Sequence, residues 1–518
     1  MPELSRQRRL LVLGICCMSL FIVGLDSTIV NVALPSIGRE LHASVSGLQW
    51  TIDAYALVLA SLLMFSGSTA DRIGRRKTFQ AGLAVFTIGS LLCSLAPGLG
   101  WLVAFRMIQA VGGSMLNPVA MSIIANTFTD PAERARAIGV WGGVFGLSVA
   151  LGPVVGGALV DSVGWRGIFW VNIPVGIAAI VLTALFVPES RASRYRRPDP
   201  VGQVLVIVLL ASLTYAIIEG PGSGWASAKI LFFFGLALAA LIMFLAWEPR
   251  RDDPLIDPRF FRSAPFSGAT ATAVTAFAAM GGFLFLNTLY LQDVRGFSPL
   301  AAGLYVLPMA VTMAVCAPLA GRIVAARRAR IPLVIAGLAL IVGGVLLTRL
   351  TDTTGPGFLV ISYVILGAGF GLVNAPITNA AVSGMPRQQA GVAAGVASTS
   401  RQVGTSLGVA VMGSVLNGNL HGAMNTGFVP ASQPGWWIVA ACGDAAGQEG
   451  GYLLECLRAD GGGLDQGGTR SQMPGDTAYD LPHRGRIGEH SDDHVGVTNR
   501  LGRTRRYAGA LRLERLGA

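Results

Sequence analysis

Apolar stretches of about 20 residues recur along the first 440 or so residues, with short polar breaks between them. A helix needs about 20 apolar residues to cross a hydrocarbon core of about 30 Å. Hydrophobic residues make up 52% of the 518 and charged residues only 13%, a balance that a soluble core and polar shell do not reach. We therefore expect an all-α polytopic membrane protein. Thirteen full spans are predicted: 10–34, 49–69, 78–97, 101–124, 137–160, 167–187, 199–219, 227–246, 265–291, 299–321, 331–349, 357–383 and 393–416.

Arginine supplies nearly all of the positive charge, because only Lys77 and Lys229 among the 39 Lys and Arg residues are lysines. Neither lysine lies in a G-x-x-x-x-G-K-[ST] phosphate loop, so we expect no nucleotide partner, and an ion gradient is the remaining obvious energy source. The arginines lie in short loops rather than on one polar face, which argues against nucleic acid. The six cysteines show no C-x-x-C spacing, so neither a metal nor another cofactor is expected.

The basic residues are divided unevenly between the two ends of the predicted spans. With the N-terminus inside, 22 Lys and Arg residues fall in cytoplasmic segments and five on the other face. The positive-inside rule therefore predicts a multi-pass protein of the bacterial inner membrane with a cytoplasmic N-terminus. The first apolar run carries Asp26 and Asn31 and is too long for a signal peptide, so we expect it to be retained as a span.

A weak internal repeat links the two halves of the chain. The turn over 67–77 after the second span has a counterpart after the tenth, Gly321-Arg322-Ile323 followed by Arg327-Arg328, which lacks an aspartate. Such a repeat predicts two six-helix bundles around a midplane site, separated by two extra helices. The expected division is an N-terminal bundle over 1–198, two extra helices and a loop over 199–264, a C-terminal bundle over 265–442 and a polar tail over 443–518.

Two aspartates, Asp26 and Asp53, lie inside predicted spans rather than at a span's first or last residue, and a charge there is costly and usually faces a cavity. Asp26 lies deep in the first span, in the stretch Leu25 to Pro35, and could bind a proton or a cation. The alternative is a structural hydrogen-bond anchor between helices. Asp53 lies nearer the outer end of the second span, where a proton or cation site and a helix end wetted by water are equally compatible with the pattern.

Arg106 is followed at helical spacing by Gln109, Gly113 and Asn117, so these residues share one face of the fourth span. A buried arginine above a strip of amide and glycine predicts a cavity wall. The alternative is that Arg106, only five residues after Trp101, extends to water at the outer end of the span.

The fifth span is rich in small residues and contains Gly152, Pro153, Gly156 and Gly157. Small residues at four-residue steps allow close helix approach, and Pro153 bends the helix. For the glycines alone, ordinary tight packing is the better explanation.

The turn after the second span carries both signs of charge and an ordered glycine spacing: Gly67, Asp71, Arg72, Gly74 and Arg75. Asp71 can pair with an arginine or with the positive N-terminus of a neighbouring helix. We favour a conformational latch over a purely topological role for the basic residues.

These motifs together resemble the major facilitator superfamily, and within it the 14-span drug:proton antiporters of the EmrB/QacA type, over residues of about 10 to 442. The chain is also similar to actinobacterial tetracycline and spectinomycin efflux pumps. The resemblance implies that Asp26 and Arg106 take part in proton coupling and cation binding. It further implies that Asp71 and Arg72 stabilise one access state, and that the Gly152-Pro153 bend helps to set the export direction.

The last span departs from the family. Gly435 to Cys442 begins like a family span, but we expect a turn at Gly443, after which the chain is polar and Gly-rich. Eight or nine apolar residues rise only about 13 Å as a helix, so the last helix is expected to be incomplete. A frameshift near codon 443 would explain this; the alternative is a genuine polar tail. An apolar run in another reading frame after Cys442 would support the frameshift, and its absence from both would exclude it.

The predicted function is proton-coupled efflux of amphiphilic, cationic drugs, including tetracycline-like antibiotics and dyes. The partners are therefore small-molecule drugs, protons and the lipid bilayer. An uptake carrier for a metabolite shares the architecture and is the first alternative. A non-transporting membrane protein, or a transporter inactivated by loss of its last helix, is the second. We do not expect an enzyme, because no His, Cys or carboxylate cluster has catalytic spacing.

Overall fold

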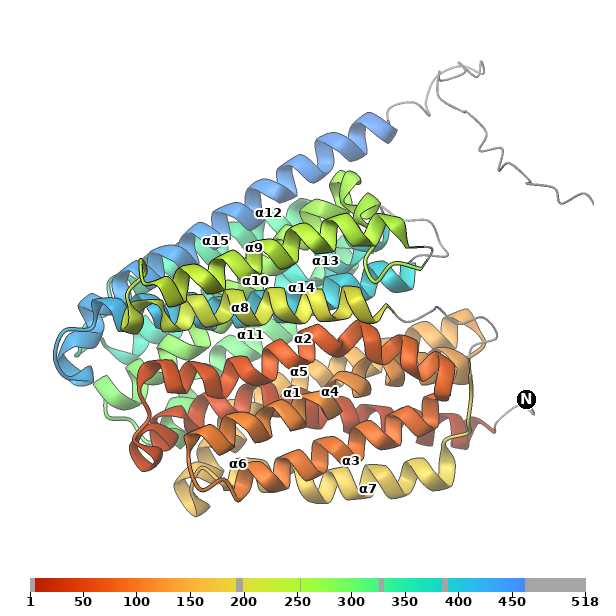
Figure 1. The fold of residues 1–518 in the computed structure, drawn as a ribbon, viewed down its shortest axis with the longest axis horizontal. Coiled ribbons are helices and arrows are strands. Elements are labelled where there is room, and N and C mark those ends of the chain that lie inside the picture. The colour runs from red at the N-terminus through yellow and green to blue at the C-terminus, as the bar shows by residue number, and fades with distance from the viewer. Residues whose placement is uncertain (1–4, 192–198, 252, 326–329, 384–389, 462–518) are drawn as a thin grey trace, which may run out of the picture. The chain divides into compact units, whose positions relative to one another are not determined.

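The computed structural model describes residues 5–191, 199–251, 253–325, 330–383 and 390–461, which form helices and no strands (Figure 1). This confirms the all-α expectation. The helices are α1 (Arg6–Leu41), α2 (Val45–Ile73), α3 (Arg75–Ser94), α4 (Leu99–Thr127), α5 (Pro131–Val163), α6 (Gly167–Trp170), α7 (Asn172–Phe186), α8 (Pro200–Ser223), α9 (Ala228–Trp247), η1 (Glu248–Arg250), η2 (Pro258–Arg262), α10 (Ala264–Leu289), η3 (Tyr290–Val294), α11 (Pro299–Ala325), α12 (Arg330–Leu347), α13 (Pro356–Ser383), α14 (Ala390–Asn419) and α15 (Met424–Gly461).

All thirteen predicted spans coincide with helices, and the span over 167–187 is divided at Val171 into α6 and α7. Within the described ranges, eleven helices are long and apolar enough to cross a membrane. α3 and α14 are not among the eleven. α3 opens on the basic run over 75–77, and α14 carries Arg401 among serines and threonines.

The helices pair in the same way in the two halves of the chain. α1 packs on α5, α2 on α4, and α3 on α4 and α7. Correspondingly, α10 packs on α14, α11 on α13, and α12 on α13 and α15. α11 thus takes the place of α2, as the weak repeat predicts, although Arg327 and Arg328 of that repeat lie outside the described residues. The exact bundle boundaries at 198, 264 and 442 stay predictions.

The expected turn at Gly443 is wrong, because α15 runs without a break from Met424 to Gly461. The glycines that suggested a turn serve close packing instead. A Cβ placed on Gly443 would lie 2.7 Å from the backbone nitrogen of Ile341, and one on Gly337 would lie 2.7 Å from the Cα atom of Gly447. Small residues therefore let α12 and α15 approach closely, and this contact offsets the poor helix propensity of glycine. α15 is nevertheless not among the eleven sufficiently apolar helices, and residues 462–518 of the predicted tail lie outside the description.

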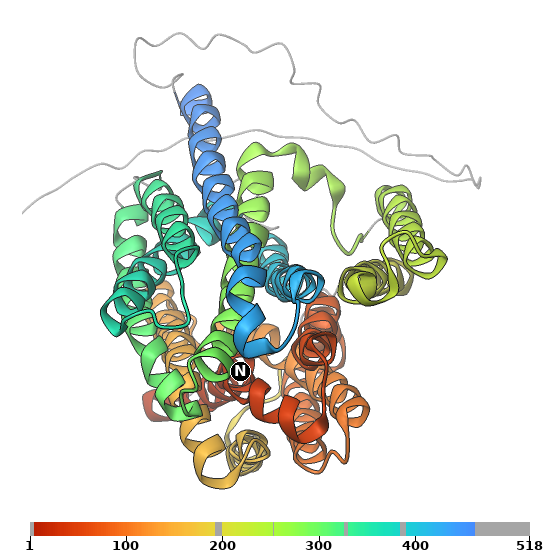
Figure 2. The same cartoon turned by 90° about the vertical axis from the view of Figure 1, so that its left-hand side faces the viewer.

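The two extra helices, α8 and α9, pack on each other as a hairpin (Figure 2). α8 contacts α2 of the first half and α14 of the second half. Trp50 of α2 donates its indole hydrogen to Glu219 at 3.0 Å, and Gln203 donates to the Ser61 carbonyl at 2.6 Å. Polar contacts near both ends of α8 therefore hold the hairpin against α2.

Candidate functional site

Asp26 and Arg106 form a buried ion pair between α1 and α4. The Arg106 Nη1 atom lies 2.6 Å from Asp26 Oδ2, and the two residues are 1% and 0% exposed. The other carboxylate oxygen of Asp26 accepts hydrogen bonds from Gln109 Nε2 at 2.8 Å and from Asn172 Nδ2 at 3.2 Å. The alternative in which Arg106 extends to water is therefore wrong, because a carboxylate in the protein interior stabilises the guanidinium there.

Further polar groups complete the surroundings of this pair. Ser90 of α3 accepts from both Gln109 and Asn172, at 2.8 and 3.3 Å. The Arg106 guanidinium lies 4.1 Å from the ring centroid of Tyr55 on α2. Ser90, Tyr55 and Asn172 were not predicted as site residues. Asn172, a buried amide in an apolar segment, carried a usable signal.

Asn117 does not reach the Asp26 network. It lies eleven residues after Arg106 on α4, about 16 Å along the helix axis. Its Oδ1 atom is buried and has no hydrogen-bond partner among the described residues. Gly113, between the two, faces the Tyr55 hydroxyl, which would lie 3.1 Å from a Cβ at that position. The predicted strip therefore continues along α4, but of its polar residues only Arg106 and Gln109 form hydrogen bonds with Asp26.

Asp53 is buried separately, at the contact between α2 and α14. It is 0% exposed, and within the described ranges neither of its carboxylate oxygens makes a hydrogen bond of ordinary geometry, although the Ser406 hydroxyl lies beside it. One helical turn earlier, Gln49 donates to the carbonyl oxygens of Val409 and Ala410, at 3.2 and 2.8 Å. The alternative of a wetted helix end is wrong, since Asp53 is enclosed by the opposite half of the chain.

The charged turn over 67–77 is held by an ion pair and by a partner from the end of α7. Asp71 Oδ1 accepts from Arg75 at 3.1 and 2.8 Å, whereas Arg72 is exposed. The Glu189 carboxylate accepts from the Arg76 backbone nitrogen at 3.1 Å. Asp71 therefore pairs with an arginine, as expected, but with Arg75 in this conformation. Glu189 was not predicted, because sequence spacing does not connect residues 113 positions apart.

Gly74 links α2 to α3 with a φ of 131°, which side chains rarely adopt. A Cβ there would also lie 2.9 Å from the Glu189 carboxyl carbon. We expect Gly74→Ala to destabilise the protein by about 1–3 kcal/mol, measured as a lower Tm in detergent. Gly224→Ala is the matched control, because Gly224 has a φ of 84° in open space. Equal losses of Tm in the two variants would show that contact with Glu189 adds nothing.

The four residues of the Gly-Pro segment face two different helices. Gly152 and Gly156 pack against α1, and a Cβ on Gly156 would lie 2.7 Å from Ile29 Cγ1. Gly157 packs against α11, where a Cβ would lie 2.6 Å from Leu300 Cα. The Pro153 carbonyl group lies against Gly303 of α11. These glycines therefore allow close helix packing, and the packing includes a contact between the two halves.

Contacts between the halves gather at the face opposite the charged turn, where α1, α5 and α10 end and α2 and α11 begin. Among the described residues, five hydrogen bonds or ion pairs join the halves there: Gln292 Nε2 to Val32 O at 2.8 Å, the Leu300 nitrogen to Asp161 Oδ2 at 3.0 Å, Gln49 Nε2 to Val409 O at 3.2 Å and to Ala410 O at 2.8 Å, and Arg39 Nη1 to Asp293 Oδ1 at 3.4 Å. We call this the closed face.

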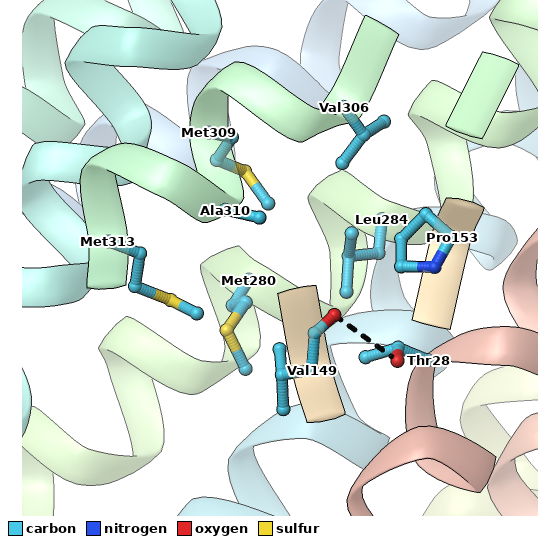
Figure 3. A pocket seen from close by; sticks show the side chains of 9 residues that line it. All are labelled: Thr28, Val149, Pro153, Met280, Leu284, Val306, Met309, Ala310 and Met313. Carbon is cyan, nitrogen blue, oxygen red and sulfur yellow. Dashed lines mark hydrogen bonds between the residues drawn. The ribbon is translucent and has the colours of Figure 1, made fainter. Parts of the chain in front are cut away.

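A small apolar pocket lies between the halves (Figure 3). The first half contributes Thr28, Val149 and Pro153, and the second half contributes residues of α10 and α11 that include three methionines. These residues are Met280, Leu284, Val306, Met309, Ala310 and Met313. Methionine side chains are flexible and polarisable, so the wall can adapt to apolar guests of different shapes.

Comparison with known proteins agrees with this architecture. Residues 16–409 match the family model described as Major Facilitator Superfamily. The multidrug resistance protein Stp of Mycobacterium tuberculosis is 38% identical over 399 residues, which are 77% of this chain and 74% of that protein. The tetracenomycin C resistance and export protein of Streptomyces glaucescens is 37% identical over 428 residues, which are 82% of this chain and 79% of that protein.

A solved structure shows the same fold at low sequence identity. It is a bacterial homologue of the human lysosomal transporter Spinster, matched with a TM-score of 0.61 and 18% identity over 88% of this chain and 98% of that chain. The resemblance drawn from the motifs is thus confirmed at the level of the family, and the chain is a multi-pass membrane protein. With the family model matching residues 16–409, the chain belongs to the major facilitator superfamily.

Proposed function

We propose that this chain exports amphiphilic drugs across the bacterial inner membrane in exchange for protons. Its two relatives described above are named for multidrug resistance and for resistance to and export of tetracenomycin C. The observation that carries the proposal is the buried ion pair of Asp26 and Arg106, since an ionisable pair inside a membrane protein usually belongs to an ion pathway. Neither a nucleotide nor a metal is part of the proposed cycle.

Proton coupling follows from what protonation of Asp26 would do to its neighbours. A neutral Asp26 no longer compensates the charge of Arg106, and breaking such a buried pair costs about 3–5 kcal/mol. The helices α1 and α4 that carry the pair would then favour a different arrangement. An inward-moving proton also gains about 2.3 kcal/mol per 100 mV of membrane potential, which is enough to drive export against a useful gradient.

The contacts at the closed face support a cycle of alternating access. In the described conformation the Gly-Pro segment of α5 lies against α11, and Gln49 binds α14. Opening this face requires these contacts to separate while the charged turn closes the other side. In this scheme Asp71 and Arg72 stabilise one access state, and Asp53, buried without an ordinary hydrogen bond in the described residues, is a second candidate proton site.

The proposed orientation places the charged turn in the cytoplasm. Alkaline phosphatase, which is active only outside the cytoplasm, is fused after Arg191 or after Gly224, on either side of α8. We expect an inactive fusion at Arg191 and an active one at Gly224, because the basic residues of the charged turn and of the 191–197 loop favour the inner side. Activity only at Arg191 would reverse the orientation, and with it the proposed direction of proton flow.

Expression in a pump-deficient bacterium tests the function. We expect the chain to raise resistance to several amphiphilic drugs and to lower the steady-state level of a fluorescent drug in the cells, and expect a protonophore to abolish this exclusion. Accumulation of the drug above the vector control would instead support an uptake carrier. Exclusion that survives the protonophore would contradict proton coupling.

A further inference from the structure

A second arginine, Arg401, lies within a predicted span, the one over 393–416. Arg401 is the twelfth residue of the 30-residue helix α14, about 16 Å from its start, and its side chain is partly buried. A charge at such a depth is costly and usually faces a cavity or a partner. Arg401 is not part of any sequence motif that the proposed transport cycle uses.

Arg401 differs from Arg106 in its partners. Its Nη1 atom lies 3.4 Å from both Asn374 Oδ1 and Thr378 Oγ1, and its Nη2 atom donates to Ser398 Oγ at 2.8 Å. All three acceptors are neutral. In the part of the chain that the structure describes, the ion pairs involve other residues, so the charge of Arg401 is not neutralised by a carboxylate.

The helix α10 links the arginine to the wall of the apolar pocket between the halves. Its guanidinium carbon is 5.9 Å from the ring centroid of Phe277 on α10. Phe277 and Met280 are three residues apart and share one face of that helix. Met280 lines the pocket together with Met309 and Met313 (Figure 3). Thr378, beside the guanidinium, is exposed, so the arginine also adjoins accessible space.

We propose that Arg401 is an anion-binding residue of the drug site, which takes a carboxylate, phenolate or enolate oxygen of a cargo whose apolar body contacts the methionines of the pocket. This rests on the proposed export function and names its substrate class. A guanidinium forms strong, often bidentate hydrogen bonds with such oxygens, and the two 3.4 Å contacts are weak enough to be exchanged for them. Cation binding was expected at the Asp26 carboxylate. In the structure this carboxylate already accepts hydrogen bonds from Arg106, Gln109 and Asn172.

Binding of two xanthene dyes to the purified full-length protein in detergent tests this assignment. Fluorescein is anionic and rhodamine 6G cationic, and fluorescence anisotropy reports the Kd of each. We expect the wild-type protein to bind fluorescein and Arg401→Gln to weaken that binding about tenfold or more, because glutamine cannot form the charge-assisted hydrogen bonds of a guanidinium. Rhodamine 6G binding should change less than about threefold. Arg401→Lys keeps the charge and should retain part of the fluorescein affinity.

Arg349→Gln, which removes an exposed positive charge after α12, is the matched control and should leave both affinities unchanged. Equal weakening of both dyes by Arg401→Gln would show a structural role and overturn the assignment, as would a wild-type protein that binds no fluorescein. If Arg401→Gln does not fold, an equal loss of affinity for fluorescein and for rhodamine 6G in Arg401→Lys overturns it. Because binding needs no gradient, charge-selective binding without efflux would contradict the proposed export and leave the assignment of Arg401 intact.

Discussion

Asp26→Asn is expected to abolish proton-driven drug efflux while the protein remains in the membrane. Asparagine matches the shape of aspartate and can still accept from Gln109 and Asn172, but it cannot be charged or take up a proton. Arg106 is then left without its counter-charge in both states of the cycle. We expect transport in everted vesicles with an imposed pH gradient to fall to the level of vector controls.

Two variants separate loss of coupling from loss of structure. Asp352→Asn removes an exposed carboxylate between α12 and α13 and should transport normally. Asp26→Glu keeps an ionisable group and should retain part of the activity. Membrane levels and elution as a single species establish that Asp26→Asn is folded. Full efflux by a folded Asp26→Asn protein would remove Asp26 from the coupling mechanism.

Gly303→Leu is expected to cause a large loss of transport, because the closed face can no longer form. Gly303 lies against the Pro153 carbonyl group, and a Cβ there would lie 2.7 Å from the Pro153 carbonyl carbon. A leucine cannot fit between two backbones at this distance, so α5 and α11 must separate. We expect less than about a tenth of the wild-type efflux, because each 1.4 kcal/mol of strain reduces the closed population about tenfold.

A control variant and a cysteine-labelling experiment distinguish failure to close this face from a general loss of structure. Gly321→Leu, on the same helix but with nothing within 4 Å of its Cβ position, should transport normally. A cysteine introduced at Leu300 should become more reactive towards a membrane-impermeant thiol reagent in Gly303→Leu, and no more so in the control. Unchanged reactivity together with lost transport would contradict the proposed closing role of the α5–α11 contact.

Much of the fold follows from patterns that the sequence displays directly. Apolar runs of spanning length predicted thirteen helices, because lipid requires each backbone polar group to be satisfied within its own helix. The error at Gly443 arose because glycine has two uses that look alike in a sequence. Glycine often ends helices in water-exposed segments, whereas in α15 it allows the backbone of α12 to approach closely.

The candidate site was only partly predictable. Buried charges are rare enough that Asp26, Asp53 and Arg106 could be singled out, yet their mutual placement depends on how helices pack. Thus Asp26 meets Arg106, whereas Asp53 faces Ser406 of the other half. Residues such as Ser90, Glu189 and Gly303 acquire their roles from partners far away in sequence, whereas helical periodicity predicts only neighbours within one helix.

Drug-induced proton release from the purified protein shows whether Asp26 exchanges a proton for a drug. The protein is held in a weakly buffered detergent solution, and pH is recorded as drug is added to the wild type and to Asp26→Asn. We expect the wild type to release protons in an amount that saturates with drug binding, and a folded Asp26→Asn protein that still binds the drug to release none. Equal proton release by the two proteins would contradict it.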